Sequence, residues 1–293
     1  MTLDQILIFA TIAQTGSLGA AAKKLNRTQP TLSVALKKLE GELGLLLFSR
    51  KEYRVSLTPA GLGLLKKAEI LLNQAEEFAN LGKYLASGYE TEVQVTFDPL
   101  IPMQPILLVL KSFEQRYCHT QFTLVSQYLS GGGDKLAREE VDLAFIIWPV
   151  NHQAFDHLKV SELTMQFVVG KQFPLKNPNR IFSLAEMKDQ AQIVIRDSSI
   201  EPKPEQFNTI KGGRQWFVTD AQTKKEIIIA GMGWGSLPTH FIQNELTCGD
   251  LIKIEVEGLP TGEPIGVFLS KKRGRPLGLV AQEIWNQFEK ATL

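Results

Sequence analysis

The segment AAKKLNRTQPTLSVALKKLEGELG, residues 21–44, constrains the fold most, because it contains two short helical patterns separated by a turn too tight for a domain linker. The inward side of its second helix follows a period of about 3.6 residues and consists of Leu32, Ala35, Leu36, Leu39 and Leu43. The opposite side has no carboxylate and consists of Pro30, Val34, Lys37 and Gly41, flanked by Thr31, Ser33 and Lys38. An ordinary solvated face would mix both signs of charge, so this side is a candidate binding surface.

The residues before and within this segment predict three helices. Apolar residues repeat at helical spacing over residues 3–13, up to a break at Gly16. A second helix is expected from Ser17, a natural N-cap, through residue 25. Thr28 can cap the third helix, and Pro30 lies in its first turn, where a missing N–H costs nothing.

A wing and an excess of basic residues complete this unit. Two short strands, Leu45 to Phe48 and Arg54 to Leu57, are expected around a basic tip. Residues 1–88 contain 11 Lys and Arg against 7 Asp and Glu, although the whole chain has a net charge of only +1. Residues 23–54 supply 8 of those basic residues against 3 acidic ones, which suits a polyanionic partner.

This pattern is typical of a winged helix-turn-helix whose second motif helix lies in the DNA major groove. Short polar side chains would then read base edges, Val34 would touch a thymine methyl, and basic side chains would hold phosphates. The residues that we expect to contact DNA are Arg27, Thr28, Gln29, Pro30, Thr31, Ser33, Val34, Lys37, Lys38, Arg50 and Arg54. The alternative is a three-helix cap on the next domain with a lysine-rich solvated side.

The chain resembles LysR-type transcriptional regulators. The resemblance starts at FATIAQTGSLGAAAKKLNRTQPTLSVALKKLEGELGLLLFSR, continues through LTPAG, and resumes at VDLAFII and IIIAGMGWGSLP, so it covers nearly the whole chain. Thr28, Gln29, Pro30 and Ser33 match recognition positions of the family, whereas Val34 stands where many members have Arg or Lys. The resemblance implies a regulator of transcription that binds double-stranded DNA as a homodimer or homotetramer, with a small-molecule effector and RNA polymerase as further partners.

A long helix from about Pro59 to Ser87 is expected after the wing. A seam of alternating large and small residues runs along it and consists of Gly61, Leu64, Ala68, Leu71, Ala75, Phe78, Gly82 and Leu85. Such a seam needs a partner, and in LysR-like proteins this helix is the dimer linker. The alternative is a helix packed on its own domain.

Downstream, strands and helices alternate, which predicts an α/β fold with mostly parallel sheets. The resemblance implies a periplasmic-binding-protein-like architecture of two effector subdomains. The expected boundaries are 1–58 for the DNA-binding domain, 59–87 for the linker helix, 88–161 with 265–293 for subdomain I, and 162–264 for subdomain II. Two crossover strands near Val160 and Pro264 would form the hinge.

A small effector is expected at the carboxyl ends of the strands, between the subdomains. The candidate residues are Asp98, Pro99, Leu100, Ile101, Tyr128, Ser130, Trp148, Arg196 and Ser198. Their mixture of apolar and polar groups favours a small organic acid or an aromatic metabolite. The alternative is a closed cleft, in which the segment DPLIP packs against Trp148 and the regulator answers to concentration or to a partner protein.

No enzyme signature, cofactor motif or metal-ligand spacing stands out. The run SGGGD lacks the ending of a phosphate-binding loop, so a flexible turn before a helix is expected. Cys118 and Cys248 have no basic cluster in sequence around them, and we expect buried, inert thiols; a thiol-based redox sensor remains the alternative function. The basic run Lys271 to Arg275 is expected to be a solvated loop.

The chain has no uninterrupted apolar stretch of about 18 residues, the length that a membrane-spanning helix needs. Its first residues also lack the basic cluster of a signal peptide. We therefore expect a cytoplasmic protein without a membrane partner.

Overall fold

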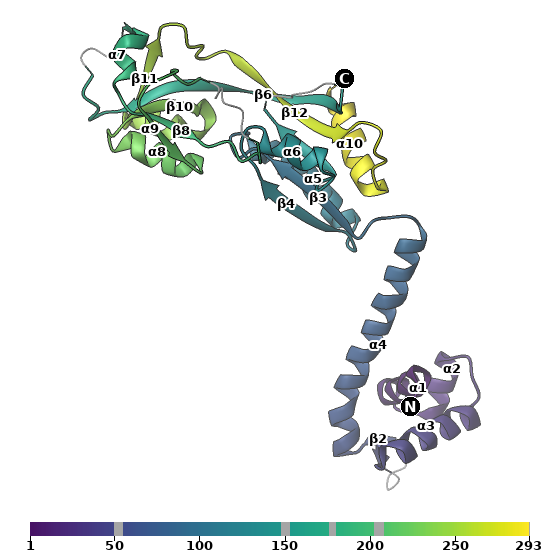
Figure 1. The fold of residues 1–293 in the computed structure, drawn as a ribbon. Helices are drawn as coiled ribbons and strands as arrows, with labels where there is room; N and C mark the ends of the chain where they lie inside the picture. Colours follow the sequence, from purple (N-terminus) through teal and green to yellow (C-terminus); the bar gives the residue numbers. More distant parts are fainter. Residues whose placement is uncertain (50–54, 148–152, 176–179, 202–207, 293) are drawn as a thin grey trace. The chain divides into compact units, whose positions relative to one another are not determined.

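The computed structural model describes residues 1–49, 55–147, 153–175, 180–201 and 208–292. The chain divides into two compact units, Met1–Ser87 and Gly88–Leu293 (Figure 1). Among the described residues, no single helix is long and apolar enough to cross a membrane; the first two helices reach that length only together, across a bend of 119°.

The described residues of the first unit form four helices and a two-stranded antiparallel sheet. In chain order these are α1 (Leu3–Thr15), α2 (Leu18–Lys24), α3 (Gln29–Leu43), β1 (Phe48–Ser49), β2 (Ser56–Leu57) and α4 (Pro59–Ala86). The three predicted helices and the two strands of the wing are confirmed, but both strands are shorter than expected: residues 45–47 lie outside the first and Val55 lies outside the second. The predicted tip of the wing, with Arg50 and Arg54, lies outside the described residues.

Local capping explains where these helices start and stop. Gly16 ends α1 in the left-handed conformation with φ of 69°, and the Ser17 hydroxyl accepts a hydrogen bond from the Ala20 N–H at 3.1 Å. Thr28 occupies the N-cap position of α3 as predicted, but its side chain makes no capping bond. Its hydroxyl pairs instead with the Thr31 hydroxyl at 2.8 Å, so the prediction of a side-chain cap was wrong.

The inward stripe of α3 is confirmed except at its end. Leu32, Leu36 and Leu39 are buried in the core of the first unit, whereas Leu43 is 37% exposed because it lies in the last turn of the helix. The Glu40 carboxylate, also buried, accepts a hydrogen bond from the Leu47 N–H at 2.7 Å. This bond ties α3 to the start of the wing.

The predicted seam of α4 is divided between two environments. Its first part packs on the unit's own core, with Ala68 buried and Leu64 in contact with the core cluster. Farther along, Leu71, Phe78 and Leu85 are exposed, and 80% of Phe78 is accessible to solvent. The alternative of a helix packed on its own domain is therefore correct for the first two turns or so, and the rest of the seam faces solvent in the single chain.

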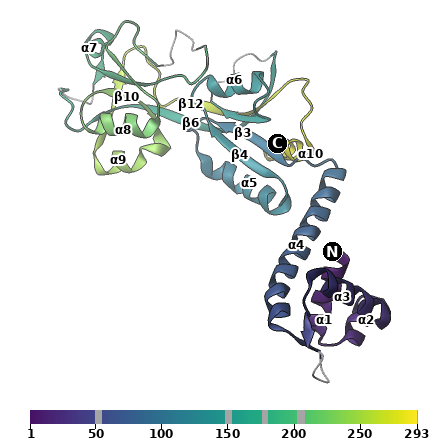
Figure 2. The same cartoon turned by 60° about the horizontal axis from the view of Figure 1, so that its bottom comes forward.

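The second unit has a spine of two long antiparallel strands, β6 (Phe155–Gly170) and β12 (Pro264–Lys272), which pair from Phe155 with Lys272 to Thr164 with Pro264. On one side the sheet continues through β5 (Leu143–Ile146), β3 (Glu92–Phe97) and β4 (Gln121–Ser126), which run parallel to one another. On the other side it continues through β10 (Trp234–Pro238), β8 (Gln192–Ile195) and β9 (Gln215–Val218), also mutually parallel. The predicted crossover strands are thus a single continuous ribbon through both halves (Figures 1 and 2).

Helices and short strands complete the two halves. The first half includes α5 (Met103–Arg116), α6 (Gly131–Ala137) and α10 (Leu279–Thr292), and the second includes α7 (Leu184–Lys188), α8 (Ala221–Ile229), the 3₁₀ helix Thr239–Phe241, α9 (Gln243–Cys248), β7 (Ile181–Phe182) and β11 (Leu251–Val256). The return of the last helix to the first half is confirmed, because the Phe288 ring lies 5.3 Å from the Phe145 ring of β5.

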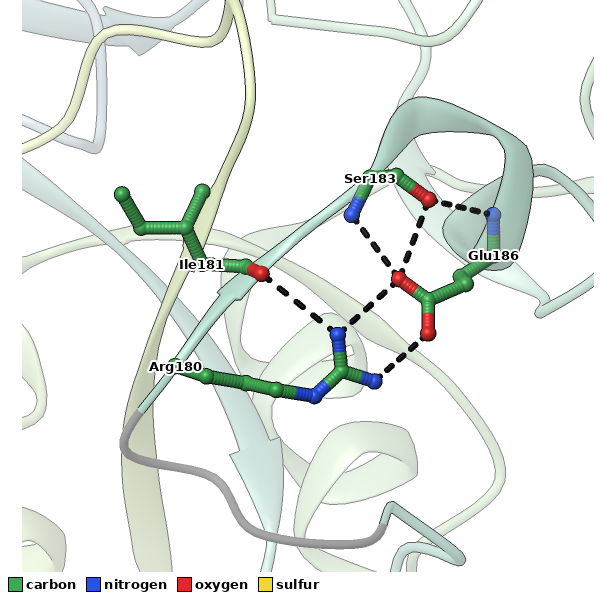
Figure 3. Close-up of polar contacts among 4 residues, drawn as sticks. All are labelled: Arg180, Ile181, Ser183 and Glu186. Carbon is green, nitrogen blue, oxygen red and sulfur yellow. Dashed lines mark hydrogen bonds and ion pairs between the residues drawn. The ribbon is translucent and has the colours of Figure 1, made fainter.

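Polar side chains fix the start of α7, at the edge of the second half. The Arg180 guanidinium forms a bidentate pair with Glu186, at 2.6 and 3.0 Å, while Ser183 and Glu186 form a capping box (Figure 3). Hydrogen bonding to Arg180 and Ser183 lowers the pKa of Glu186 to about 2. The helix start therefore keeps this charge over the ordinary pH range.

Gly61 in the first turn of α4 provides a test of the packing between this helix and the wing. A Cβ atom at Gly61 would lie 2.1 Å from the Leu47 carbonyl oxygen, whereas one at Gly63 would meet nothing within 4 Å. We expect Gly61→Ala to destabilise the first unit by roughly 1–3 kcal/mol, and Gly63→Ala to stabilise it by roughly 0.5–1 kcal/mol. Denaturant unfolding would measure both; equal effects of the two variants would contradict this packing.

Candidate DNA-binding helix and effector cleft

The outward face of α3 is open to solvent and free of acidic side chains. Val34 is 67% exposed, and Pro30, Thr31, Lys37 and Lys38 are also exposed. The helix keeps this face free of the core because Leu32, Leu36 and Leu39 occupy the opposite side. An exposed face with short polar groups, one apolar group and lysines is chemically suited to a groove between phosphate chains.

Several of the predicted DNA contacts already have protein partners. The Arg27 guanidinium forms an ion pair with Asp4 of α1 at 2.7 Å, and Thr28 and Thr31 share a hydroxyl hydrogen bond. A Cβ atom at Gly19 would lie 2.8 Å from Gln29 Nε2, so the amide end of Gln29 lies directly against α2. These contacts position the start of α3 relative to the two preceding helices.

The first strand end of the predicted cleft, after β3, is a buried structural corner. The Asp98 carboxylate accepts hydrogen bonds from the Leu100 N–H at 2.9 Å and the Leu129 N–H at 3.0 Å. Burial raises the pKa of Asp98 to about 7, although both of these bonds favour the ionised form. Leu100 and Ile101 are also buried, and Pro99 is half-buried. Asp98 therefore uses its oxygens to hold the backbone.

Leu129 shows what this carboxylate holds in place. Its φ of 57° lies in the left-handed region, which is unfavourable for a leucine. The bond from its N–H to Asp98 stabilises that conformation and aims the two neighbours of Leu129 at the second half of the unit.

The segments that follow β4 and β8 are in direct contact with each other. The Tyr128 N–H donates to Ser198 Oγ at 2.9 Å, and the Ser130 N–H donates to the Asp197 carboxylate at 3.2 Å. The Ser130 hydroxyl donates to the other oxygen of Asp197. The Tyr128 hydroxyl also accepts a bond from the Ala221 N–H, at the start of α8, at 3.0 Å. Ser130 and Ser198 thus join the two halves.

Arg196, another predicted residue, does not join this contact. Arg196 is exposed and its guanidinium lies 5.9 Å from the centre of the Phe217 ring. Trp148 lies outside the described residues, so the alternative in which it closes the cleft stays a prediction. Asp197 lies in the strand end, residues 196–199, that was predicted to supply effector contacts, but no role was predicted for its carboxylate.

The glycine run at Gly131 to Gly133 is not the flexible turn that was predicted. The three glycines form the first turn of α6 and are buried. A Cβ atom at Gly131 would lie 2.2 Å from Ser198 Oγ, so glycine permits the close approach of the two strand ends. Packing, and not flexibility, explains the run.

A cavity of about 40 Å³ lies beside these strand ends. Its lining comes from both halves and consists of Leu100, Leu129, Met165, Gln192, Ile193, Val194, Ile195, Asn208, Thr209, Lys224 and Ser236. Leu100 is the predicted effector residue in this set. The surprising member is Lys224 on α8, which is 6% exposed.

Lys224 is buried without a counter-charge. Within the described ranges, no carboxylate forms an ion pair with its ammonium group, and burial lowers its pKa to about 7. A Cβ atom at Gly235 would lie 2.9 Å from Lys224 Cε, so the glycine leaves the space that the lysine stem fills. Sequence reasoning missed this residue, yet the helical spacing of Ala221, Lys224 and Ile228 places it on the inward face.

The other candidate sites have different outcomes. Both cysteines are free and exposed, so the prediction of buried thiols was wrong. Cys118 follows the end of α5, and Cys248 is the last residue of α9. Basic side chains of the run after residue 270 form ion pairs with acidic ones: Lys272 with Glu139 at 2.6 Å, and Arg273 with Asp156 at 2.8 Å. Those pairs give the run a structural role.

Comparison with known proteins agrees with this arrangement. Residues 3–62 match the family model described as "Bacterial regulatory helix-turn-helix protein, lysR family", and residues 86–291 match the one described as "LysR substrate binding domain". The HTH-type transcriptional activator AllS of Klebsiella pneumoniae is 31% identical over 253 residues, which cover 85% of this chain and 93% of that protein. The HTH-type transcriptional regulator YeeY of Escherichia coli is 26% identical over 267 residues, covering 90% and 86%.

Solved structures support the same fold. Full-length CbnR in complex with its target DNA is similar with a TM-score of 0.53 at 17% identity, and the likeness covers all of both chains. The ranges that the two family models match correspond to the helical first unit and to the α/β unit of this chain. The chain therefore belongs to the LysR family of DNA-binding transcriptional regulators.

Proposed function

We propose that this regulator binds an inverted-repeat operator as a homodimer or a homotetramer, and that a small effector bound between the two halves of the α/β unit controls it. The observation that carries the proposal is the exposed, carboxylate-free face of α3. A two-fold dimer would present two such helices to half-sites on one face of the duplex. A footprint of the purified protein on the DNA that flanks its own coding region tests this directly.

The roles on α3 are proposed to differ by position. Gln29, Thr31 and Ser33 lie in the first turns, where recognition helices contact base edges, and Val34 is exposed enough to touch a thymine methyl. Lys37 and Lys38 follow one turn later and would hold phosphates. In this proposal, Arg27 contacts the phosphate backbone of the DNA only after its exposed ion pair with Asp4 breaks.

The exposed part of the α4 seam supports a dimer. Leu71 lines an apolar recess of about 160 Å³ together with residues of α1 and α3 of the same unit. The Phe78 side chain is almost fully exposed to solvent. Large apolar side chains repeated at helical spacing on an exposed helix are typical of a helix that pairs with another one. We propose that α4 of a second copy of the chain packs against this exposed part of the seam.

The thiol-sensor alternative has less support. A reactive thiolate needs a positive neighbour, but the Cys248 thiol donates a hydrogen bond to the Asp250 carboxylate at 3.2 Å. An unchanged response to peroxide in a Cys248→Ser variant would leave this alternative without support.

Base-reading and phosphate-binding residues should separate in a binding assay. We expect Gln29→Ala and Ser33→Ala each to cost on the order of 1–3 kcal/mol at one base position and to relax preference there. Lys37→Ala should weaken binding to operator and random DNA alike and reduce the salt slope by about 1. Competition titrations at several salt concentrations measure both, and an equal loss on operator and random DNA for Gln29→Ala would contradict its assignment.

The dimer should depend on the exposed seam. A charge at Leu71 or Phe78 would be buried without a partner in the pair, so Leu71→Glu and Phe78→Glu should convert dimers into monomers with weakened operator binding. The control is Asn80→Glu, which adds the same charge at an exposed position on the opposite face of the same helix. Analytical ultracentrifugation decides the matter, because an unchanged mass for Phe78→Glu would place dimerisation elsewhere.

Effector binding should depend on the space at the meeting point of Ser130 and Asp197. An indole ring at Ser130 would fill the meeting point of the two halves and would leave the residues of α3 unchanged, so Ser130→Trp should keep operator affinity and lose effector-induced stabilisation. Ser130→Ala, which removes one hydroxyl without filling space, is the control. Thermal shifts against a set of small organic acids and aromatic metabolites provide the readout, and an unaltered response of Ser130→Trp would move the site away from the cleft.

A further inference from the structure

The cavity beside the strand ends contains two hydrogen-bond donors whose partners are absent from the described part of the chain. Lys224 on α8 and Ser236 on β10 both line it, and they are 6% and 9% exposed. Neither side chain has a hydrogen bond or an ion pair to another described residue. In contrast, the side-chain amide of Gln192, in the same lining, donates to the Asn208 carbonyl and accepts from the Ile210 N–H. The two donors are therefore free to bind a ligand.

We propose that Lys224 and Ser236 bind the carboxylate of a small monocarboxylic acid, and that this acid is the effector. The inference rests on the proposed function, because it assigns a chemical class to the effector of the same cleft. The ammonium group supplies the positive charge and up to three donors, and the hydroxyl supplies one more. The rest of the acid lies against the apolar wall.

The lining favours a monocarboxylate over other anions. Leu100, Met165 and Ile193 form an apolar part of the lining that the two donors share, which suits a ligand with an apolar part. A phosphate or sulfate dianion would need more donors than one ammonium and one hydroxyl, since burying a charge without compensation is costly. A cavity of about 40 Å³ has room for roughly three water-sized groups. The carboxylate and first carbon atoms of a small acid fit that room.

A purely structural role for Lys224 explains less. A buried lysine without a partner destabilises the fold, and an apolar side chain of similar length would fill the same space on this helix face. The neighbouring Lys225 shows the ordinary solution, because it is also largely buried but pairs with Glu245 at 2.7 Å. Gly235 has no side chain and so leaves room for the Lys224 stem.

The test uses the full chain and matched pairs of acids and amides. Thermal shift and isothermal titration are measured with acetate, propionate and butyrate, with propionamide and butyramide as neutral counterparts, and with sodium chloride at equal ionic strength. At least one carboxylate should stabilise the protein by mass action, and its amide and chloride should not. Lys224→Met should lower the affinity for that carboxylate by at least about tenfold, the loss of one charge-assisted contact. Ser236→Ala should lower it less.

Two controls keep the result interpretable. Lys253→Met makes the same substitution at an exposed lysine on β11, outside the cavity lining, and should leave carboxylate affinity unchanged. Lys224→Met should remain folded, with a melting temperature at or above that of the wild type, because it removes a buried unpaired charge.

The outcomes separate this inference from the cleft itself. Equal affinity of the acid and its amide, equal stabilisation by chloride, an unchanged carboxylate affinity in Lys224→Met, or the absence of any stabilisation by the three acids would overturn it. A neutral ligand whose binding survives Lys224→Met and is lost in Ser130→Trp would overturn the acid assignment while the cleft proposal stands. Carboxylate binding that is lost in Lys224→Met but kept in Ser130→Trp would support the lysine site and contradict the cleft prediction made for Ser130.

Discussion

The antiparallel pairing of β6 with β12 is the interaction on which the α/β unit depends. This ribbon runs through both halves, and each half builds its parallel strands outward from it. Because the parallel strands of the two halves end near the same place, the segments after β4 and β8 come within hydrogen-bond distance of each other. The cleft is thus a consequence of strand order, and bending or twisting of the ribbon is the motion that would open it.

Charge is arranged differently in the two units. In the first unit basic groups gather on the exposed face of α3, where water compensates them until a polyanion replaces it. In the second unit an acid and a base, Asp98 and Lys224, are withdrawn from water, and burial moves the pKa of both towards neutrality. Asp98 is compensated by two backbone N–H groups. Lys224 has no such compensation among the described residues, which is why we connect it with a ligand.

Local sequence patterns predicted most elements correctly where one interaction dominates. Gly16 sets the end of α1 through its left-handed conformation, and Ser17 sets the start of α2 through its capping side chain. Both preferences act within a few residues. The inward stripe of α3 and the alternation of strands and helices were likewise predicted from spacing. Predictions were wrong where a neighbour distant in sequence competes, as when the Thr31 hydroxyl binds Thr28, or when Ser198 packs on Gly131 and makes a supposed flexible turn part of a buried helix.

The sequence by itself determined the order of elements, the basic face of α3 and the family, because helical period, capping residues and charge are properties of short segments. Only the tertiary structure decided that part of the α4 seam packs on its own unit, that both cysteines are exposed, and that Ser130 meets Asp197 across the two halves. It also decided that Lys224 points into a cavity with Leu100, which lies 124 residues earlier in the chain. Burial and unsatisfied charge depend on which distant segments fold together, and no local pattern contains that information.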